Sequence, residues 1–414
     1  MLAVRNFAWL WVGALSSSFA MNMQIIARGW LVYTLTSSAI DLAWVTMSFM
    51  VPTVLFSLYG GVLADRMPKR RVIVWAQALN CGATVVMALI IFSETVTFWD
   101  FIWFGFFNGS VLALSMPARQ AFVPELVGEH LVFAAMGLNT AGWNLARIVG
   151  PAFAGLLIAL IASGDKTSHY GVGIVYLVIA VLYFVSAVTM LFIDRVGRVK
   201  QDRKASAFAD MQEGLRYVMH NPPVFGLIVL SIIPFLFGMP LTTLLPAFNE
   251  EILGGHADDL GFLVSAMGGG AIIGSFMMAT MGQLRNKSAW LLLTCIAWGA
   301  VTAAFGMSQT QVLATILIAA VGWVSSWNMS MNRGMLQMQV DDRMRGRIMS
   351  IDMMSHGLMP LGVFPISWIA ETYDVGAALV VSGIAFMLLI LFVCFFVPAV
   401  RTTDRARKTA RAAA

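Results

Sequence analysis

Charged side chains are scarce in this chain. Only 11% of its 414 residues are Asp, Glu, Lys or Arg, whereas 59% are hydrophobic. A soluble globular domain carries about 25% charged residues, which keep its surface in water. The scarcity therefore excludes a soluble domain and indicates a chain that is surrounded by lipid.

Cysteine is also rare, and the familiar catalytic motifs are absent. Cys81, Cys295 and Cys394 lie far apart in apolar segments, so their spacing predicts neither disulfides nor a metal site. The sequence has no Gly-x-x-x-x-Gly-Lys-Ser/Thr loop, no His-Glu-x-x-His helix and no Gly-x-Ser-x-Gly elbow. We therefore expect no enzyme activity, no ATP-driven step and neither a cofactor nor a metal.

Long apolar runs are what the sequence has instead. A stretch of about 20 apolar residues is enough to cross a bilayer as a helix. The runs predict helices at 7–34, 39–63, 72–92, 98–116, 133–163, 172–193, 223–248, 260–283, 289–307, 312–332, 348–370 and 376–398. We therefore predict an all-α polytopic membrane protein with twelve transmembrane helices in two pseudo-symmetric six-helix bundles.

Basic residues gather on one side of the predicted membrane. Of the 26 Lys and Arg residues, 23 fall in the two tails or in alternate gaps between the runs. The exceptions are Arg28 and Arg147, inside apolar runs, and Lys166, on the opposite side. Short loops rich in Lys and Arg stay in the cytoplasm. We expect a multi-pass protein of the cytoplasmic (inner) membrane with both termini cytoplasmic, facing anionic lipid rather than nucleic acid.

The longest polar gap runs from Asp194 to Pro223 and divides the runs into six and six. We predict a bundle over 1–193, a cytoplasmic linker over 194–222, a second bundle over 223–400 and a basic cytoplasmic tail over 401–414. Within the linker, apolar residues recur at helical spacing, at Phe208, Met211, Leu215 and Met219. This spacing predicts an amphipathic helix on the cytoplasmic face, with a disordered linker as the alternative.

The two halves carry similar residues in matching gaps. In the fourth gap Arg119 is followed by Val123-Pro124-Glu125, and in the tenth Arg333 is followed by Val340-Asp341-Asp342. Two parallel repeats of six helices are an arrangement found in one large class of transporters, whose substrate sites lie near the midplane at the repeat interface.

The gap after the second run carries a signature. The stretch Gly61-Val62-Leu63-Ala64-Asp65-Arg66-Met67-Pro68-Lys69-Arg70-Arg71 resembles the loop G-x-x-x-D-R-x-G-R-[RK] of the major facilitator superfamily, with Pro68 in place of the usual glycine. The resemblance implies a conformational latch across the cytoplasmic ends of the halves. Its expected members are Gly61, Asp65, Arg66, Lys69, Arg70, Arg345 and Arg347. The alternative for the basic cluster is an anchor that only keeps the loop in the cytoplasm.

Further stretches resemble the enterobactin-exporter-type branch of this superfamily. They cover residues 29–33, 119–126, 139–151 and 342–347. The run Gly150-Pro151-Ala152-Phe153-Ala154-Gly155 resembles a fifth-helix motif associated with export by antiport, although Ala146 and Ala154 stand where that motif usually has glycine. Because proline removes one backbone hydrogen bond, we predict a helix kink at Gly150 and Pro151.

Few polar groups lie at membrane depth, and each is a candidate because a charge there costs roughly 2.5–3.5 kcal/mol or more. In the first helix one face carries the expected substrate-cavity residues Ser17, Met21, Gln24 and Arg28. Arg28 is expected to attract an anionic substrate group or to pair with Asp41 or Glu371. The alternative is an arginine that reaches to the outer interface.

Other cavity candidates lie on the fifth and tenth helices. In the fifth helix they are Asn144 and Arg147, with an architectural role as the alternative for Arg147. In the tenth, Trp323 and Trp327 recur with Met331 at four-residue spacing and predict an adaptable apolar wall for amphipathic ligands. The alternative is a stripe that contacts lipid or packs against a neighbouring helix.

Asp352 and His356 stand four residues apart in the eleventh helix, and therefore on one helix face. A carboxylate beside a histidine can exchange protons near neutral pH, so the pair is the candidate for proton coupling. The alternative makes Asp352 a partner of Arg333 or Arg119 and His356 a satisfied core group. The first helix lacks the acidic residue that relatives commonly carry, which argues against ordinary proton antiport.

These features predict a secondary active transporter that exports small amphipathic or hydrophobic molecules by alternating access. Protons are the candidate coupling ion, and we expect a monomer. The alternative function is an importer or symporter of an organic anion held by Arg28. A sensor that transports nothing is a third reading, for which the latch loop would be unnecessary.

Overall fold

The computed structural model describes residues 4–127, 131–162, 169–194, 207–280, 286–341 and 344–396. Within these ranges the chain is helical and contains no strand. Eleven of its helical stretches are long and apolar enough to cross a membrane. The polytopic, all-α class predicted from the apolar runs is confirmed.

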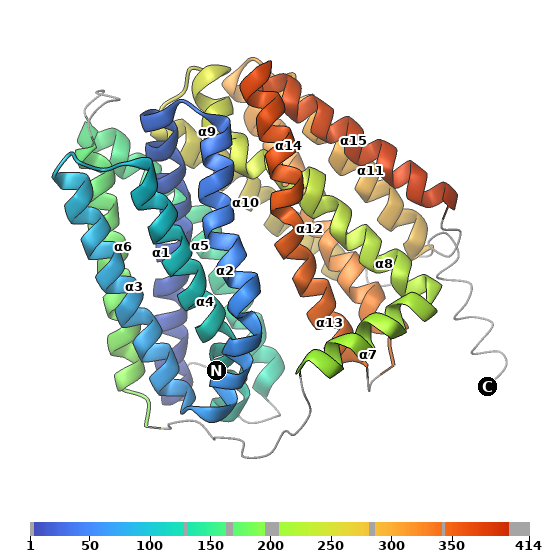
Figure 1. The fold of residues 1–414 in the computed structure, drawn as a ribbon, viewed down its shortest axis with the longest axis horizontal. Helices are drawn as coiled ribbons and strands as arrows, with labels where there is room; N and C mark the ends of the chain where they lie inside the picture. The colour runs from blue at the N-terminus through green and yellow to red at the C-terminus, as the bar shows by residue number, and fades with distance from the viewer. Residues whose placement is uncertain are drawn as a thin grey trace. The chain divides into compact units, whose positions relative to one another are not determined.

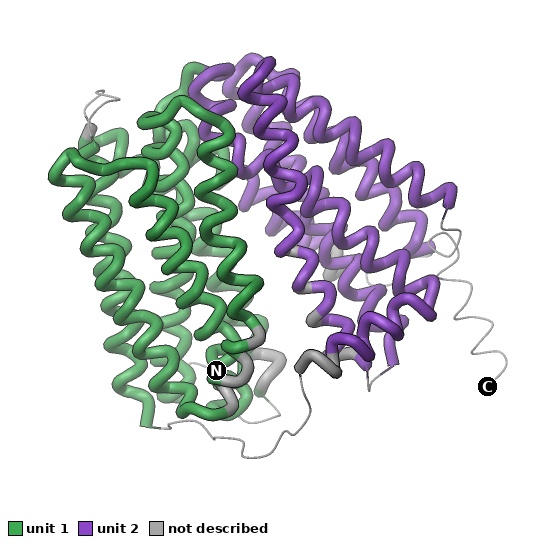
Figure 2. The backbone as a smooth tube through the Cα atoms, viewed as in Figure 1, with its two compact units in different colours: residues 1–204, 254–265 green, residues 205–253, 266–414 purple. Residues whose placement is uncertain are grey.

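Two compact units make up the fold, coloured separately in Figure 2. Unit 1 comprises residues 1–204 and 254–265. Its complete helices, labelled in Figure 1, are α1 (Arg5–Thr36), α2 (Ala39–Arg66), α3 (Lys69–Phe92), α4 (Phe98–Val127), α5 (Val132–Ala162) and α6 (Tyr170–Leu191). A short connection separates α1 from α2. There the Ser38 side chain caps the start of α2 by accepting a hydrogen bond from the backbone N–H of Asp41 at 3.2 Å.

Unit 2 comprises residues 205–253 and 266–414. Its elements in chain order are α7 (Ala207–His220), α8 (Pro222–Ile233), the π-helical η2 (Pro234–Gly238), α9 (Pro240–Glu251), the remainder of α10 (Ala257–Thr280), α11 (Lys287–Gly306), α12 (Gln311–Gln339), α13 (Arg345–Met354), the 3-10 helix η3 (Ser355–Leu358), α14 (Met359–Thr372) and α15 (Val375–Phe396).

The helix α7 lies within the predicted linker, but the face that is buried differs from the predicted apolar stripe. Val218 is 3% exposed and Gly214 is buried against α13, whereas Leu215 and Met219 are 54% and 64% exposed. The expected apolar stripe is therefore not the face that packs. The small Gly214 allows the close approach, because a Cβ there would lie 2.9 Å from Ile351.

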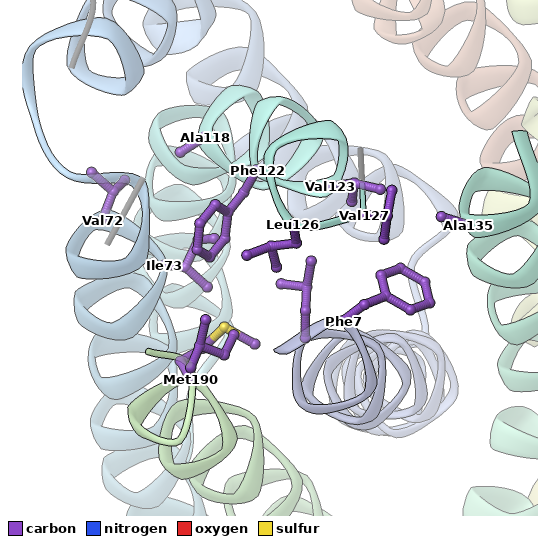
Figure 3. Packing of buried hydrophobic residues seen from close by; sticks show 12 residues of the cluster. Phe7, Val72, Ile73, Ala118, Phe122, Val123, Leu126, Val127, Ala135 and Met190 are labelled. Carbon is purple, nitrogen blue, oxygen red and sulfur yellow. The ribbon is translucent and has the colours of Figure 1, made fainter. Parts of the chain in front are cut away.

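Two helices extend well beyond the ends predicted for them. The fourth apolar run ends at 116, but α4 continues to Val127 through Pro117 and Pro124. The extension is held by a core cluster at one end of unit 1, where Phe122 and Leu126 pack with Phe7 of α1 and Ile73 of α3, as Figure 3 shows. Buried apolar contacts outweigh the lost backbone hydrogen bonds. Likewise α12 continues to Gln339 because Met335 and Leu336 are buried.

Two predicted membrane helices are interrupted in unit 2. The seventh run contains η2, which begins at Pro234 and is followed by Pro240, and neither proline can donate a backbone hydrogen bond. The eleventh run contains η3, which ends two residues before Pro360, and this run is not among the eleven stretches counted above as able to cross a membrane. π-Helical segments are rare and often lie at functional sites.

Glycines bring helices into backbone contact in both units. In unit 1, a Cβ at Gly109 of α4 would collide with the Phe49 carbonyl of α2. In unit 2, a Cβ at Gly322 of α12 would collide with the Met267 carbonyl of α10, and Gly270 meets Ala319 in the same way. Small residues permit such close packing where lipid supplies no hydrophobic drive. The second and fourth runs of each half therefore pair through equivalent seams.

The seam in unit 2 makes a stability prediction. We expect Gly322→Ala to lower the thermal unfolding midpoint of the purified protein, because overpacking costs about 1–3 kcal/mol. Gly269→Ala is the matched control, since a Cβ at Gly269 meets no atom within 4 Å. Equal midpoints for the two variants would contradict the seam.

Candidate functional site

The polar face of α1 turns toward the interior of unit 1. Ser17 and Gln24 are 7% and 6% exposed, and Met21 and Arg28 are half-buried. Ile25, outside that face, is 43% exposed. The four predicted residues therefore do lie along one largely buried face. Their assignment to a substrate cavity stays a prediction.

Arg28 lies among aromatic side chains. Its guanidinium carbon is 5.8 Å from the ring centroid of Phe49 on α2. It also interacts electrostatically with the hydroxyl of Tyr176 on α6. Within the described part of unit 1, no carboxylate forms an ion pair with Arg28, so the expected pairing with Asp41 is not made. A half-buried cation without a carboxylate is suited to an anionic ligand group.

Tyr176 is fully buried beside that cation. Its ring contacts Phe104 of α4, with ring centroids 5.8 Å apart. Its hydroxyl has no hydrogen-bond partner among the described residues. An unpaired buried hydroxyl is costly, so this group is available to a water or a ligand oxygen near Arg28.

A second arginine, on α4, contacts the polar face of α1 at Ser17. Arg119 of α4 donates from Nη1 to the Ser17 hydroxyl at 2.7 Å. Arg119 also interacts electrostatically with Tyr183 of α6. The oxygen of Ser17 is therefore engaged by a helix-to-helix contact. Tyr176 and Tyr183 lie seven residues apart on α6, and each interacts electrostatically with one of the two arginines.

The fifth-helix candidates lie on α5, which runs as a single helix through Pro151. Asn144 and Arg147 are half-buried, and Nε of Arg147 has no hydrogen-bond partner among the described residues. Gly150 packs on α1, since a Cβ there would lie 3.2 Å from that of Asn22. The kink at Pro151 stays a prediction.

Unit 1 also includes the start of α10, which packs on α5. A Cβ at Gly261 would lie 2.6 Å from the carbonyl oxygen of Pro151, and one at Gly155 would collide with the Ala257 carbonyl. The Ser265 hydroxyl donates to the Ile148 carbonyl at 2.6 Å. The glycines of the predicted antiport motif therefore serve as a close helix contact.

Two predicted latch residues are bound within unit 1. Lys69 is buried and forms an ion pair with Glu125 of α4 at 2.9 Å. Arg70 donates to the carbonyls of Met190 and Leu191 at 2.9 and 2.8 Å, which satisfies the C-terminal end of α6. Arg66 is exposed. The side chain of Asp65 lies outside the described residues, and the latch role of Gly61 and Asp65 stays a prediction.

In unit 2 the basic motif that opens the eleventh run contacts α7. Arg347 forms an ion pair with Glu213 at 2.7 Å, and the Tyr217 hydroxyl donates to Asp341 at 3.3 Å. Burial raises the pKa of Tyr217, so the phenol remains a neutral donor. The ion pair joins α7 to α13, and the hydrogen bond joins α7 to Asp341, which follows the end of α12. The side chain of Arg345 lies outside the described residues.

The tryptophans of α12 pack against α11. Trp327 is 6% exposed and stacks on Trp290, with ring centroids 5.8 Å apart. Trp323 is half-buried and 6.0 Å from Trp327. The indole N–H groups of Trp323 and Trp327 have no hydrogen-bond partner among the described residues. The structure thus gives these rings a helix-packing role, and their place in a substrate cavity stays a prediction.

Asp352 of α13 is 1% exposed and has partners on two other helices. Its Oδ1 accepts a hydrogen bond from Ser231 of α8 at 2.5 Å, and its Oδ2 lies 3.6 Å from Nε of Arg333 on α12. The pairing with Arg333 was the alternative expected from sequence. His356 lies in the 3-10 helix η3, whereas Asp352 lies in α13. The α-helical spacing that would place the two residues on one face is therefore not kept between them. Its side chain lies outside the described residues.

Several of these partners were not predicted from the sequence. Ser231, Tyr176 and Trp290 carry no charge and sit in apolar runs, where such residues are common. Their contacts with Asp352, Arg28 and Trp327 depend on how neighbouring helices are aligned along their lengths, which the sequence does not give. Glu213 does lie at helical spacing on the predicted amphipathic helix, but its partner Arg347 is far away in sequence.

Comparisons with known proteins find similarity over most of the chain. A family model described as transmembrane secretion effector matches residues 1–413. The staphyloferrin A transporter of Staphylococcus aureus is 24% identical over 375 residues, covering 90% of this chain and 91% of that protein. The multidrug efflux pump Tap of Mycolicibacterium fortuitum is 25% identical, covering 95% and 96%. The enterobactin exporter EntS of Shigella boydii is 25% identical, covering 70% and 67%.

Solved structures share the fold at lower identity. The nucleoside transporter NupG has a TM-score of 0.74 at 14% identity and covers 94% of this chain and 98% of that chain. A bacterial homolog of the human lysosomal transporter Spinster, facing inward, has a TM-score of 0.72 at 13% identity and covers 97% and 96%. These similarities confirm the fold.

The buried ion pair in unit 1 gives a second stability prediction. We expect Lys69→Gln to lower the free energy of unfolding by about 1–3 kcal/mol, because it leaves a partly buried carboxylate on Glu125. Adding Glu125→Gln should restore part of the loss, as a double-mutant cycle would measure.

Arg347→Gln is the matched control for that cycle. It breaks the pair with Glu213, whose side chain is 60% exposed, so we expect a loss below about 1 kcal/mol. Equal losses for Lys69→Gln and Arg347→Gln would show that burial of the Lys69 pair contributes nothing.

Proposed function

Because the chain belongs to the transmembrane secretion effector family of the major facilitator superfamily, we propose that it exports small amphipathic or hydrophobic molecules. It is a multi-pass membrane protein and a secondary transporter of small molecules, not an enzyme. Alternating access of two six-helix bundles is the proposed mechanism, with the substrate near the midplane.

The observation that carries this proposal is the family match over residues 1–413, with relatives named for efflux or export. The substrate class is supported by the aromatic setting of the one half-buried arginine on α1. Arg28 lies near Phe49 and Tyr176, so a ligand there would meet a cation, a hydroxyl and ring faces together. Such a surface suits a molecule with a polar group on an apolar body.

Direction of transport is tested by comparing vesicles of opposite orientation. We expect inverted inner-membrane vesicles that contain the chain to accumulate an amphipathic dye when energised. Vesicles with the native orientation should exclude it. Accumulation only in the native orientation would instead support the second candidate, import or symport of an organic anion. The lack of an ion pair from Arg28 to a described carboxylate of unit 1 favours that candidate.

The proposed substrate-side residues are those of the predicted cavity. They are Ser17, Met21, Gln24, Arg28, Asn144, Arg147, Trp323 and Trp327. We add Tyr176, because its buried hydroxyl is unpaired among the described residues. Protons are the proposed coupling ion, with Asp352 and His356 as candidates. We also propose that the protein is a monomer in the inner membrane with both termini in the cytoplasm. Asp65 is proposed to belong to the conformational latch.

Arg28→Ala should weaken binding of anionic substrates by about 10- to 100-fold, the loss of one hydrogen bond to a charged group. Neutral substrates of similar size should lose less than about threefold, because their affinity depends on area rather than charge. Ligand-induced thermal shifts on the purified protein measure both. The matched control is Arg5→Ala, which removes an exposed arginine of the same helix, α1. Equal losses for both substrate classes would indicate a folding defect.

Replacing Asp352 with Asn and His356 with Gln together should remove the dependence of transport on an imposed pH gradient. The variant should still exchange substrate down its own gradient, because no proton is needed for that half of the cycle. Flux into liposomes with and without the pH gradient measures the effect. A gradient response that survives in the double variant excludes this pair from proton coupling.

A further inference from the structure

The register of α1 against α4 places Asn108 at the height of Arg28. The two helices run in opposite directions, because the connections after α1, α2 and α3 are short. The Arg119 side chain donates to Ser17 at 2.7 Å, which fixes where the helices meet. Arg28 lies eleven residues after Ser17, and Asn108 lies eleven residues before Arg119. Eleven residues make about three helical turns, or about 16 Å, so Arg28 and Asn108 return to the same faces as that contact.

Contacts with α2 agree with this register. The guanidinium carbon of Arg28 lies 5.8 Å from the ring centroid of Phe49 on α2. The backbone of Phe49 meets α4 at Gly109, where an added Cβ would collide with the Phe49 carbonyl. Gly109 directly follows Asn108 in the chain. The same residue of α2 therefore lies beside Arg28 and beside the turn of α4 that carries Asn108.

Two buried polar groups in this part of unit 1 lack partners. The Asn108 side chain is 5% exposed, and Tyr176 is fully buried. The ring of Tyr176 contacts Phe104, one turn before Asn108 on α4, and its hydroxyl interacts electrostatically with Arg28. Neither Nδ2 of Asn108 nor the Tyr176 hydroxyl has a hydrogen-bond partner among the described residues. Each unpartnered buried group costs about 1–3 kcal/mol, which a bound ligand would recover.

All three groups are able to donate a hydrogen bond. The guanidinium of Arg28 and the amide N–H of Asn108 only donate, and the Tyr176 hydroxyl can do so. A matching ligand group therefore carries acceptors, as a carboxylate or a halide ion does. Within the described part of unit 1, no carboxylate forms an ion pair with Arg28, so one positive charge is left to balance.

The balance of charge limits the ligand group to a single negative charge. The second arginine of this polar face, Arg119, is about three turns away along α4 and already donates to Ser17. A doubly charged group beside Arg28 would keep one buried negative charge without a counter-ion. An uncompensated buried charge is strongly unfavourable, so the site should discriminate against phosphate and sulfate groups.

We infer that Arg28, Tyr176 and Asn108 together bind one singly charged anionic group, either the carboxylate of an amphipathic substrate or a free chloride ion. Arg28 supplies the charge, and the Tyr176 hydroxyl and the Asn108 amide donate to the acceptor atoms. The rings of Phe49 and Phe104 give the site apolar walls. For a substrate carboxylate, this inference rests on the proposed function and names the substrate class as monocarboxylates.

Thermal unfolding of the purified full chain tests the ligand class. In a mildly alkaline buffer whose only other anion is sulfate, we expect naphthoate or chloride to raise the unfolding midpoint. Methyl naphthoate, which is neutral, and naphthyl phosphate, which is doubly charged, should raise it much less. A rise with naphthoate identifies a substrate carboxylate, and a rise with chloride alone identifies a free ion. No rise with either, or an equal rise with naphthyl phosphate, would overturn the inference.

The variant Tyr176→Phe tests the hydroxyl. We expect the effective anion to bind about 10- to 100-fold more weakly, the loss of one hydrogen bond to a charged group. The ligand-free midpoint should not fall, because the change removes an unpaired buried hydroxyl. Tyr183→Phe is the matched control, the same change two turns along α6, where the tyrosine interacts with Arg119 instead. Unchanged binding in Tyr176→Phe, or equal losses in the two variants, would contradict the site.

The variant Asn108→Asp supplies an anion from the protein itself. A carboxylate at this position should pair with Arg28, so we expect a ligand-free midpoint above that of wild type and no further rise with naphthoate or chloride. A lower midpoint, or an anion response that survives, would count against the inference. These measurements need no transport. Failure of the exporter assignment would therefore leave anion binding intact, and failure of anion binding would leave export in vesicles to be judged separately.

Discussion

Lipid tails neither donate nor accept hydrogen bonds, so each polar group inside this chain must find its partner within the protein or in a bound molecule. Most do so through the helix backbone and through short contacts such as Arg119 with Ser17. Arg28, Tyr176 and the cluster around Asp352 stand apart because their partnering is incomplete among the described residues. Groups of this kind are where a membrane protein can bind a ligand or an ion.

The same constraint explains how the two units are built. Apolar association is weak in lipid, so helices pair where small residues let backbones touch, as Gly109 does with Phe49 and Gly322 with Met267. Each unit then places a serine of its first helix near an arginine of its fourth.

Much of the fold could be predicted from the sequence, because runs of apolar residues, basic gaps and the loop around Asp65 are local signals. Helix ends were predicted less well, since α4 and α12 continue wherever residues such as Phe122 and Leu336 find buried contacts. The interruptions η2 and η3 depend on packing around prolines. At the candidate sites the charged residues could be found from the sequence, but their neutral partners Ser231 and Tyr176 could not, because nothing local distinguishes them from other residues of an apolar helix.

Counterflow in liposomes that contain only the purified chain tests the central claim most directly. Vesicles loaded with an unlabelled amphipathic substrate should take up the labelled compound transiently, without ATP, because an alternating-access carrier exchanges one molecule for another. Uptake no faster than in protein-free liposomes, across a set of such compounds, would contradict the account.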